Sequence, residues 1–178
     1  MKKGISVKYV TLSAMLIAMS VVIGIFCKSV LNFGGGLFRI TFENLPIILS
    51  GIIFGPVMGM AVGFASDIIS YLLSGQAYPL NIIVTLGAGA VGLVSGIVSR
   101  FVVKRRGVAQ IVCSASAAHI VGSMIIKPIG LYQFYGVAVL WRIPLYLVIA
   151  PLEILIICLL YRKEGFRRLF DVCGISDK

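Results

Sequence analysis

Residues 118–142, AHIVGSMIIKPIGLYQFYGVAVLWR, are the stretch that decides how this chain folds. They join two long apolar segments and contain the only histidine, His119, and the only tryptophan, Trp141, of the sequence. Two cations, Lys127 and Arg142, lie here too, away from the basic ends of the chain. Polar groups inside an apolar chain mark functional positions, so we predict that this stretch forms the wall and lid of a small-molecule site at one membrane face.

The composition is that of an integral membrane protein. Of 178 residues, 60% are hydrophobic and 12% are charged, with a mean hydropathy of +1.08, whereas soluble domains carry about 25% charged residues. The net charge of +10 does not indicate nucleic-acid binding, because the cations form short clusters between apolar segments. The four cysteines include no C-x-x-C pair, and the first apolar run is too long for a secretory signal. We expect one domain, residues 1–178, in a lipid bilayer, with no metal.

Six apolar segments follow one another along the chain. We expect helices at about residues 7–26, 42–54, 57–73, 80–103, 108–126 and 139–161. The second is too short to cross a hydrocarbon core of about 30 Å upright, and Gly55 and Pro56 separate it from the third. Residues 127–138 are expected to form an outer loop flanked by Lys127 and Arg142.

The distribution of charge favours six spans over five. With six spans, twelve of the sixteen Lys and Arg residues fall on one side, and only Lys28, Arg39, Lys127 and Arg142 fall on the other. Five spans would place the two basic ends of the chain on opposite sides. The positive-inside rule therefore predicts an all-α bundle of six transmembrane helices with both termini cytoplasmic.

No catalytic motif is present. The sequence has no G-x-x-x-x-G-K-[ST] loop and no G-x-S-x-G elbow, and its single histidine is incompatible with an H-E-x-x-H zinc site. We therefore expect no enzyme activity, no catalytic residues and no cofactor.

Asp67, His119 and Glu153 are ionisable residues that lie near the middle of apolar segments. His119 and Glu153 are expected at a similar depth from the helical rise, either as a structural tie or as ligand contacts. For Asp67 we favour an interhelical hydrogen bond over ligand contact. Lys127, Arg142, Trp141 and the nearby tyrosines fit ordinary snorkelling and an aromatic belt, but together they also suit a ligand with a planar ring and carboxylates.

Small residues recur every four positions in three of the segments. They are Ala14 and Ala18, then Gly55, Gly59 and Gly63, and then Ala88, Gly92 and Gly96. In lipid this spacing lets helix backbones approach closely. Ala14 and Ala18 differ from the others because they lie on a terminal helix that could face outward.

These patterns resemble a known family. A-x-x-x-A at Ala14 and Ala18, RITFENLP at residues 39–46, and FGP at residues 54–56 with Gly59, Gly63 and Asp67 resemble the substrate-binding S components of energy-coupling factor (ECF) vitamin transporters. TLGAG at residues 85–89, AHIVGSMIIK at residues 118–127 and WRIPLY at residues 141–146 resemble the folate-specific branch. The resemblance implies a multi-pass protein of the bacterial cell membrane that captures folate from outside, reorients in the membrane, and works with a transmembrane coupling subunit and two cytosolic ATPases. It also implies that Ala14 and Ala18 dock the coupling subunit.

Folate combines a flat pterin, an aryl linker and a glutamate tail with two carboxylates. Aromatic stacking suits the rings, charge-assisted hydrogen bonds from Lys127, Arg142 and Arg39 suit the tail, and a buried carboxylate suits the pterin amino edge. The candidate binding residues are Phe38, Arg39, Asp67, Tyr78, Asn81, His119, Ser123, Lys127, Gln133, Tyr135, Trp141, Arg142 and Glu153. The alternatives are an S component for riboflavin, thiamine or another vitamin, and a small membrane enzyme or channel.

Overall fold

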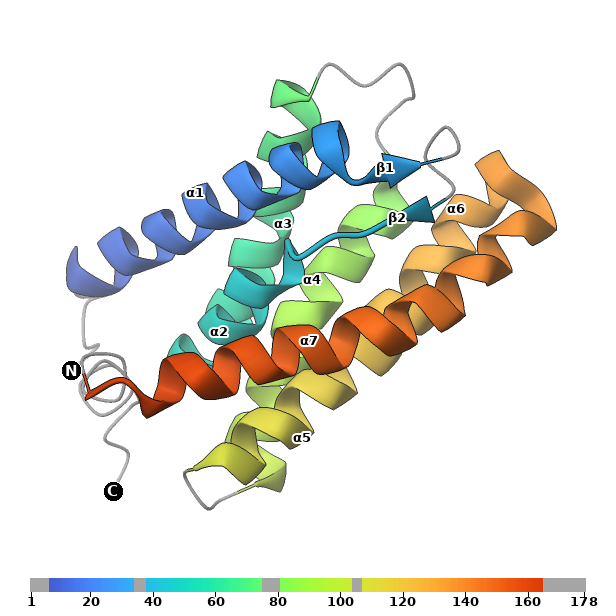
Figure 1. Ribbon diagram of the computed structural model, residues 1–178. Coiled ribbons are helices and arrows are strands. Elements are labelled where there is room, and N and C mark those ends of the chain that lie inside the picture. The colour runs from blue at the N-terminus through green and yellow to red at the C-terminus, as the bar shows by residue number, and fades with distance from the viewer. Residues whose placement is uncertain (1–6, 34–37, 75–80, 104–106, 165–178) are drawn as a thin grey trace.

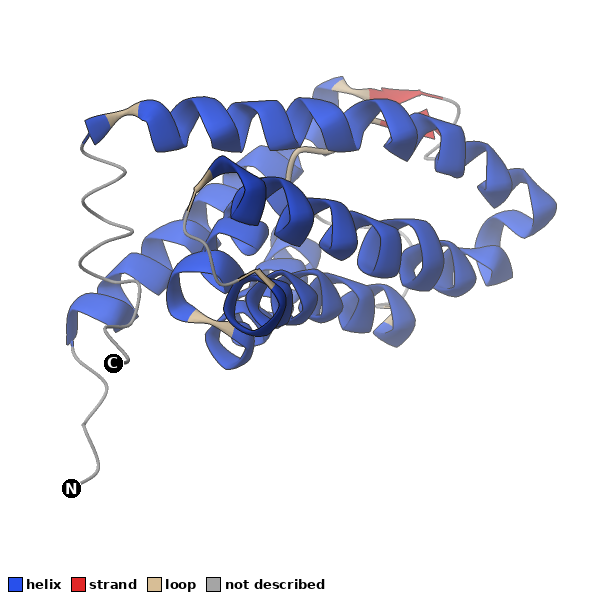
Figure 2. Ribbon diagram, turned by 90° about the horizontal axis from the view of Figure 1, so that it is seen from below, coloured by secondary structure: helices blue, strands red, loops and turns tan. Residues whose placement is uncertain are grey.

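The computed structural model describes residues 7–33, 38–74, 81–103 and 107–164 (Figure 1). Its elements in chain order are α1 (Val7–Val30), β1 (Asn32–Phe33), β2 (Phe38–Arg39), α2 (Asn44–Phe54), α3 (Pro56–Leu73), α4 (Ile82–Ile97), the π-helix η1 (Val98–Val102), α5 (Val108–Ala118), the π-helix η2 (His119–Ile126), α6 (Lys127–Tyr135), the 3₁₀-helix η3 (Gly136–Trp141) and α7 (Arg142–Arg162). Figure 2 shows that this part of the chain is almost wholly helical, apart from the antiparallel pair β1–β2. The candidate residue Tyr78 lies outside the described residues, and only the backbone of Phe38 and Arg39 is described.

The short helix α2 lies at the centre of the bundle. All eleven of its residues are buried, and it packs against α1, α3, α4, α5 and α7 (Figure 1). Eleven residues rise about 16 Å, roughly half of a hydrocarbon core of about 30 Å. A helix that is apolar on all sides is expected to be buried. Here the longer helices surround α2 and bury it.

Glycines allow α2, α3 and α4 to cross at close range. A methyl group added to Gly51 or to Gly59 would overlap the carbonyl group of Gly92. In the same way, a methyl group on Gly63 of α3 would overlap the carbonyl group of Ala88 on α4. The small-residue spacing predicts this close approach, which in lipid is stabilised by packing rather than by the hydrophobic effect.

The break between α2 and α3 is stabilised by a cation from another helix. Gly55 has φ +95°, a conformation that suits glycine, and Pro56 begins α3, where its missing N–H is not needed. Nη2 of Arg100 donates a hydrogen bond of 2.7 Å to the carbonyl oxygen of Phe54. Arg100 therefore satisfies an acceptor at the C-terminal end of α2, where the helix dipole is negative.

The expected outer loop at residues 127–138 is wrong. η2 runs directly into α6, which continues to Tyr135, and η3 follows. Pro128 does not end the helix because it occupies the first turn of α6. The chain reverses at Gly136, whose φ is +57°, and α7 then returns alongside α5 (Figure 1).

Four helical stretches within the described residues are long and apolar enough to cross a membrane. They are Val7–Val30, Pro56–Leu73, Ile82–Val102 and the 55-residue stretch Val108–Arg162, which includes the reversal at Gly136. Large apolar side chains such as those of Phe26, Leu72 and Leu147 are exposed on the outside of the bundle. The chain is therefore an all-helical membrane protein.

Candidate functional site

Lys127 is the centre of a buried polar cluster. Its side chain is only 4% exposed, and Nζ donates a hydrogen bond of 2.8 Å to Oδ1 of Asn44 at the start of α2. Nζ also lies 3.6 Å from Oε1 of Glu43. Nδ2 of Asn44 in turn donates to Oγ of Ser123 at 3.4 Å. Lys127 therefore links η2 and α6 to the N-terminal end of the central helix.

The π-helix η2 and the first residue of α6 present three polar side chains to the bundle. His119, Ser123 and Lys127 follow one another at intervals of four residues, and all three are buried. The backbone N–H of Lys127 donates to the carbonyl oxygen of Gly122, the i→i−5 bond of a π-helix. This bond widens the helical turn, and π-helical turns occur frequently at functional sites.

His119 and Glu153 form a buried pair between η2 and α7. Nε2 of His119 lies 2.8 Å from Oε2 of Glu153, and the two side chains are 1% and 0% exposed. The two atoms are within hydrogen-bonding distance but are not aligned as a hydrogen bond, and Nδ1 of His119 has no hydrogen-bond partner among the described residues. The sequence left open whether these residues tie the fold together or contact a ligand. The structure brings them together.

A small cavity lies between α1, α2, α3 and α4. Its volume is about 10 Å³, and it is lined by Ser20, Glu43, Ile47, Ser66, Asp67, Ser70 and Ala88. Asp67 is tied to α4, because Oγ1 of Thr85 donates a hydrogen bond of 2.7 Å to Oδ2 of Asp67. Oγ of Ser66 is buried and has no hydrogen-bond partner among the described residues. Five polar side chains therefore contribute to the cavity wall, and among the described residues the hydroxyl group of Ser66 is unsatisfied.

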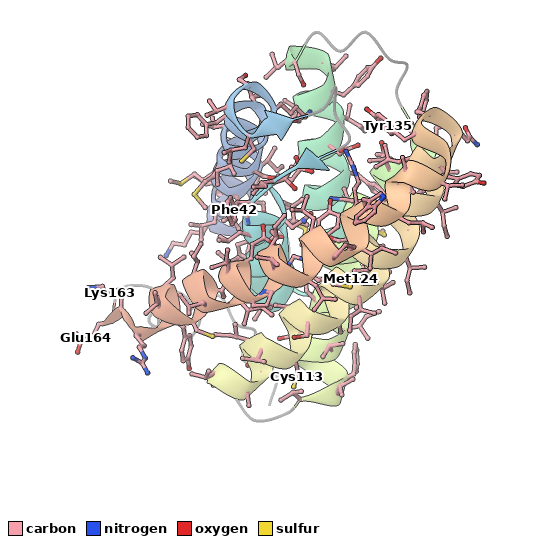
Figure 3. The ribbon with its side chains drawn as sticks, turned by 45° about the vertical axis from the view of Figure 1, so that its right-hand side comes forward. Phe42, Cys113, Met124, Tyr135, Lys163 and Glu164 are labelled. Atoms are coloured by element: carbon pink, nitrogen blue, oxygen red, sulfur yellow. The ribbon has the colours of Figure 1, made fainter. Side chains whose placement is uncertain are left out.

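The candidate residues of the second half of the chain fall into two groups. Arg142 is 8% exposed, and Cζ of its guanidinium lies 5.7 Å from the centre of the Tyr135 ring, within the range of a cation–π contact. Tyr135 lies at the end of the bundle opposite Lys163 and Glu164 (Figure 3). Trp141, which is 65% exposed, and Gln133 point outward instead. The structure does not bring these two to the Lys127 cluster.

Residues 8–170 match a protein-family model described as "ECF transporter, substrate-specific component". The chain belongs to this family. S components are the binding subunits of transporters and not enzymes, so the expectation that the chain has no enzyme activity is confirmed and the alternative of a small membrane enzyme is excluded. The chain is a multi-pass membrane protein of a transporter that is typical of prokaryotic cell membranes.

Two solved structures share the fold of this S component. One is described as "Crystal structure of FolT bound with folic acid", with 24% sequence identity, a TM-score of 0.70, and coverage of 93% of this chain and 98% of that chain. The other is "Structure and mechanism of the S component of a bacterial ECF transporter", with 21% identity, a TM-score of 0.63, and coverage of 93% and 96%. No curated protein matches the chain.

Asn81 has a structural role in this S component. Its Oδ1 accepts hydrogen bonds from the backbone N–H groups of Ile83 at 3.0 Å and Val84 at 3.4 Å, the arrangement of a helix N-cap. Its Nδ2 donates to the carbonyl oxygen of Gly130 at 2.5 Å. Asn81 therefore begins α4 and joins it to α6.

Ala14 and Ala18 are both exposed on α1. They lie one helical turn apart, so they occupy one face of the helix. The neighbouring Ser13 and Ser20 are buried, which shows that α1 turns a different face to the bundle. The A-x-x-x-A face of this S component is therefore open to another helix.

Sequence reasoning missed several members of the polar cluster. Glu43 and Asn44 contact Lys127, and Thr85 contacts Asp67, although none of the three was a candidate site residue. A further missed residue is Lys28, which lies in the last turn of α1 and donates to Oγ of Ser70 at 2.9 Å. The signal that was available was the polar pair Glu43-Asn44 at the start of a short and mostly apolar helix.

Proposed function

We propose that this S component binds folate outside the cell and delivers it together with a transmembrane coupling subunit and two cytosolic ATPases. The observation that carries the proposal is the burial of two cations, Lys127 and Arg142, which are 4% and 8% exposed. Buried cations give strong charge-assisted hydrogen bonds to carboxylates. The glutamate tail of folate supplies two such groups.

The fold comparison supports the same ligand. A structure of FolT described as bound with folic acid has the same fold over 93% of this chain. The segments of this sequence that resemble the folate-specific branch include Ser123 and Lys127, which belong to the buried cluster. We propose that the tail carboxylates bind near Lys127 and Arg142, with Arg39 as a further cation, and that Ser123 and Asn81 line the same site.

The ring system requires aromatic and acidic groups. We propose Tyr135 as a stacking partner, because it lies against Arg142 at the same end of the bundle. Phe38 and Tyr78 are proposed as further contacts of the bound ligand. For the pterin amino edge the candidates are Asp67, Glu153 and the His119 paired with it.

We further propose that the S component has six spans and that both termini are cytoplasmic. The first turn of α1 and the last turn of α7 lie on the same side of the bundle (Figure 1). Twelve of the sixteen Lys and Arg residues fall on that side in a six-span topology. Folate then reaches the site from the end that contains Tyr135. The exposed Ala14 and Ala18 face is proposed as the docking surface for the coupling subunit.

The experiment is a binding assay with the purified chain, without partner subunits and without ATP. Folate, riboflavin and thiamine are titrated separately by calorimetry, and the small molecules that co-purify with the protein are identified by mass spectrometry. We expect tight binding of folate and none of the other two. If riboflavin or thiamine binds and folate gives no heat of binding, the proposal is wrong and that vitamin is the ligand.

A further inference from the structure

Residues 128–141, which are the rest of α6 together with η3, form a helical hairpin that packs on α4 with one side. A methyl group added to Gly130 would come within 2.9 Å of Cβ of Ile83 at the start of α4. Nδ2 of Asn81 donates a hydrogen bond of 2.5 Å to the carbonyl oxygen of Gly130, and Val139 is only 2% exposed. These contacts fix which side of the hairpin faces the bundle and which side faces away from it.

The side of the hairpin that faces away from the bundle is uncharged and mostly apolar. Residues 128–141 contain no Asp, Glu, Lys, Arg or His. Five of their large hydrophobic side chains are more than half exposed, and we call these the exposed face: Ile129, Tyr132, Val137, Leu140 and Trp141. Charged residues are mostly found on surfaces that contact water, and an exposed apolar patch marks a site of interaction with a membrane or a protein. The exposed face therefore suits contact with lipid or protein better than contact with water.

The hairpin begins where the hydrocarbon core of a membrane would end. The helices α5 and η2, residues 108–126, lead into the hairpin and rise by up to about 28 Å. The helix α7 leads out of it and rises by about 31 Å. Each of these two legs therefore matches a core of about 30 Å by itself. Figure 1 shows α6 at the end of the bundle opposite to the first turn of α1 and the last turn of α7, so the hairpin lies at one boundary of the core.

The exposed face continues the apolar surface of the two legs. Ile125 of η2 and Leu147 and Val148 of α7 are each at least half exposed, and apolar side chains on the outside of a membrane-spanning helix face the acyl chains of lipids. Two members of the exposed face, Tyr132 and Trp141, combine an apolar ring with a polar O–H or N–H group, and such residues are enriched where a membrane meets water. The continuity with the lipid-facing surface favours lipid over a protein partner as the neighbour of the exposed face.

We propose that the exposed face of this hairpin lies in the interface between the headgroups and the acyl chains of phospholipids. The rings of Tyr132 and Trp141 lie among the upper parts of the acyl chains, and their O–H and N–H groups reach the headgroups or water. The next residue, Arg142, is 8% exposed and contacts Tyr135. Lipid therefore holds one side of the hairpin and α4 holds the other, so the hairpin is a fixed wall and not a lid that opens into water. The inference holds whichever ligand the protein binds.

The test uses the fluorescence of Trp141, the only tryptophan of the chain. The purified full chain is reconstituted into phosphatidylcholine vesicles whose acyl chains carry bromine atoms either near the headgroup or near the chain end. Bromine quenches the emission of an indole ring that it contacts. We expect the largest loss of emission with bromine near the headgroup and a smaller loss with bromine near the chain end. Iodide in the surrounding water should quench Trp141 less than it quenches a free tryptophan amide.

Two double variants move the indole ring and keep one tryptophan in the chain. Trp141→Phe with Tyr132→Trp keeps the indole on the exposed face, so it should give the same order of quenching as the wild-type protein. Trp141→Phe with Leu152→Trp is the matched control. Leu152 is 47% exposed and lies about 15 Å along α7 from Arg142, near the middle of the core. In this control, bromine near the chain end should cause the larger loss of emission.

Three results would overturn the proposal. If iodide quenches Trp141 as strongly as the free amide and brominated lipids have no effect, the hairpin is a loop in water. If neither iodide nor brominated lipid quenches Trp141, a protein such as a second copy of this chain covers the exposed face. If bromine near the chain end quenches Trp141 most, the hairpin lies inside the hydrocarbon core. Folate binding is a separate measurement, and neither result depends on the other.

Discussion

His119 Nε2 and Glu153 Oε2 lie 2.8 Å apart, and neither side chain is more than 1% exposed. The pair joins η2 to α7, two elements that are separated in the chain by α6 and η3. If only one of the two side chains were present, it would be a buried polar or charged group without a partner, which is destabilising. The pair therefore holds α7 against the bundle as long as both members are present.

Removal of one member of this pair should destabilise the protein more than removal of both. Glu153→Met is expected to lower the free energy of unfolding by about 3–5 kcal/mol, because His119 is left buried alone. His119→Leu combined with Glu153→Met should recover most of this loss. The measurement is thermal unfolding in detergent, with exposed Glu164→Met as the control. A single variant as stable as wild type would show that the pair contributes no stability.

The buried cations should matter for the tail of the ligand. Lys127→Ala and Arg142→Ala are each expected to weaken folate binding by about 1.5–3 kcal/mol, the range for hydrogen bonds to charged groups. Pteroate keeps the ring system and lacks the glutamate, so its affinity should fall much less. Lys163→Ala, at the opposite end of the molecule (Figure 3), is the control. If the affinities for folate and pteroate fall equally, these cations stabilise the fold or contact the ring system and do not bind the glutamate tail.

The exposed alanines of α1 should affect assembly and not ligand binding. Ala14→Trp and Ala18→Trp are expected to leave the folate affinity of the isolated protein unchanged, because neither side chain is buried in the bundle. Recovery of the complex with the coupling subunit should fall sharply, since a bulky side chain prevents close helix contact. Met19→Trp, exposed on another face of α1, should still assemble. A mutant that assembles but loses folate affinity would place the alanines beside the pocket.

The crossing of the central helices should not tolerate one added carbon atom. Gly59→Ala places a methyl group against the Gly92 carbonyl, and overpacking of this kind destabilises by about 1–3 kcal/mol. Ala61→Leu adds more volume on the same helix but at an exposed position, so it should be nearly neutral. Thermal unfolding of the two variants in the same detergent makes the comparison. Equal stability would mean that the helices can separate without loss.

The fold could be predicted because its signals are local. Hydropathy marked the long helices, and Gly55 with Pro56 marked the break after α2. The resemblance to S components is confirmed by the family match over residues 8–170. The continuation of the helix from η2 into α6 was not predicted. Pro128, directly after Lys127, is compatible with this continuation because it lies in the first turn of α6.

The site could be predicted only in part, because contacts between distant helices leave little trace in the sequence. Lys127 was identified as an unusual cation, but nothing local pairs it with Asn44, which lies 83 positions earlier. Trp141 was identified from its rarity, yet rarity does not specify the direction of a side chain, and the structure leaves it exposed. The His119–Glu153 contact was the exception, since helical rise alone placed the two residues at one depth.

The complete enclosure of α2 has a consequence for how the protein is made. None of the eleven residues of α2 faces outward, so lipid cannot hold this helix in place by itself. Its position depends on α3 and α4, which are synthesised after it. A nascent chain that stops before α4 should therefore leave α2 accessible to thiol-specific labelling at an introduced cysteine, Leu49→Cys, and the full chain should protect it. Membrane insertion and folding are then a single event for this helix.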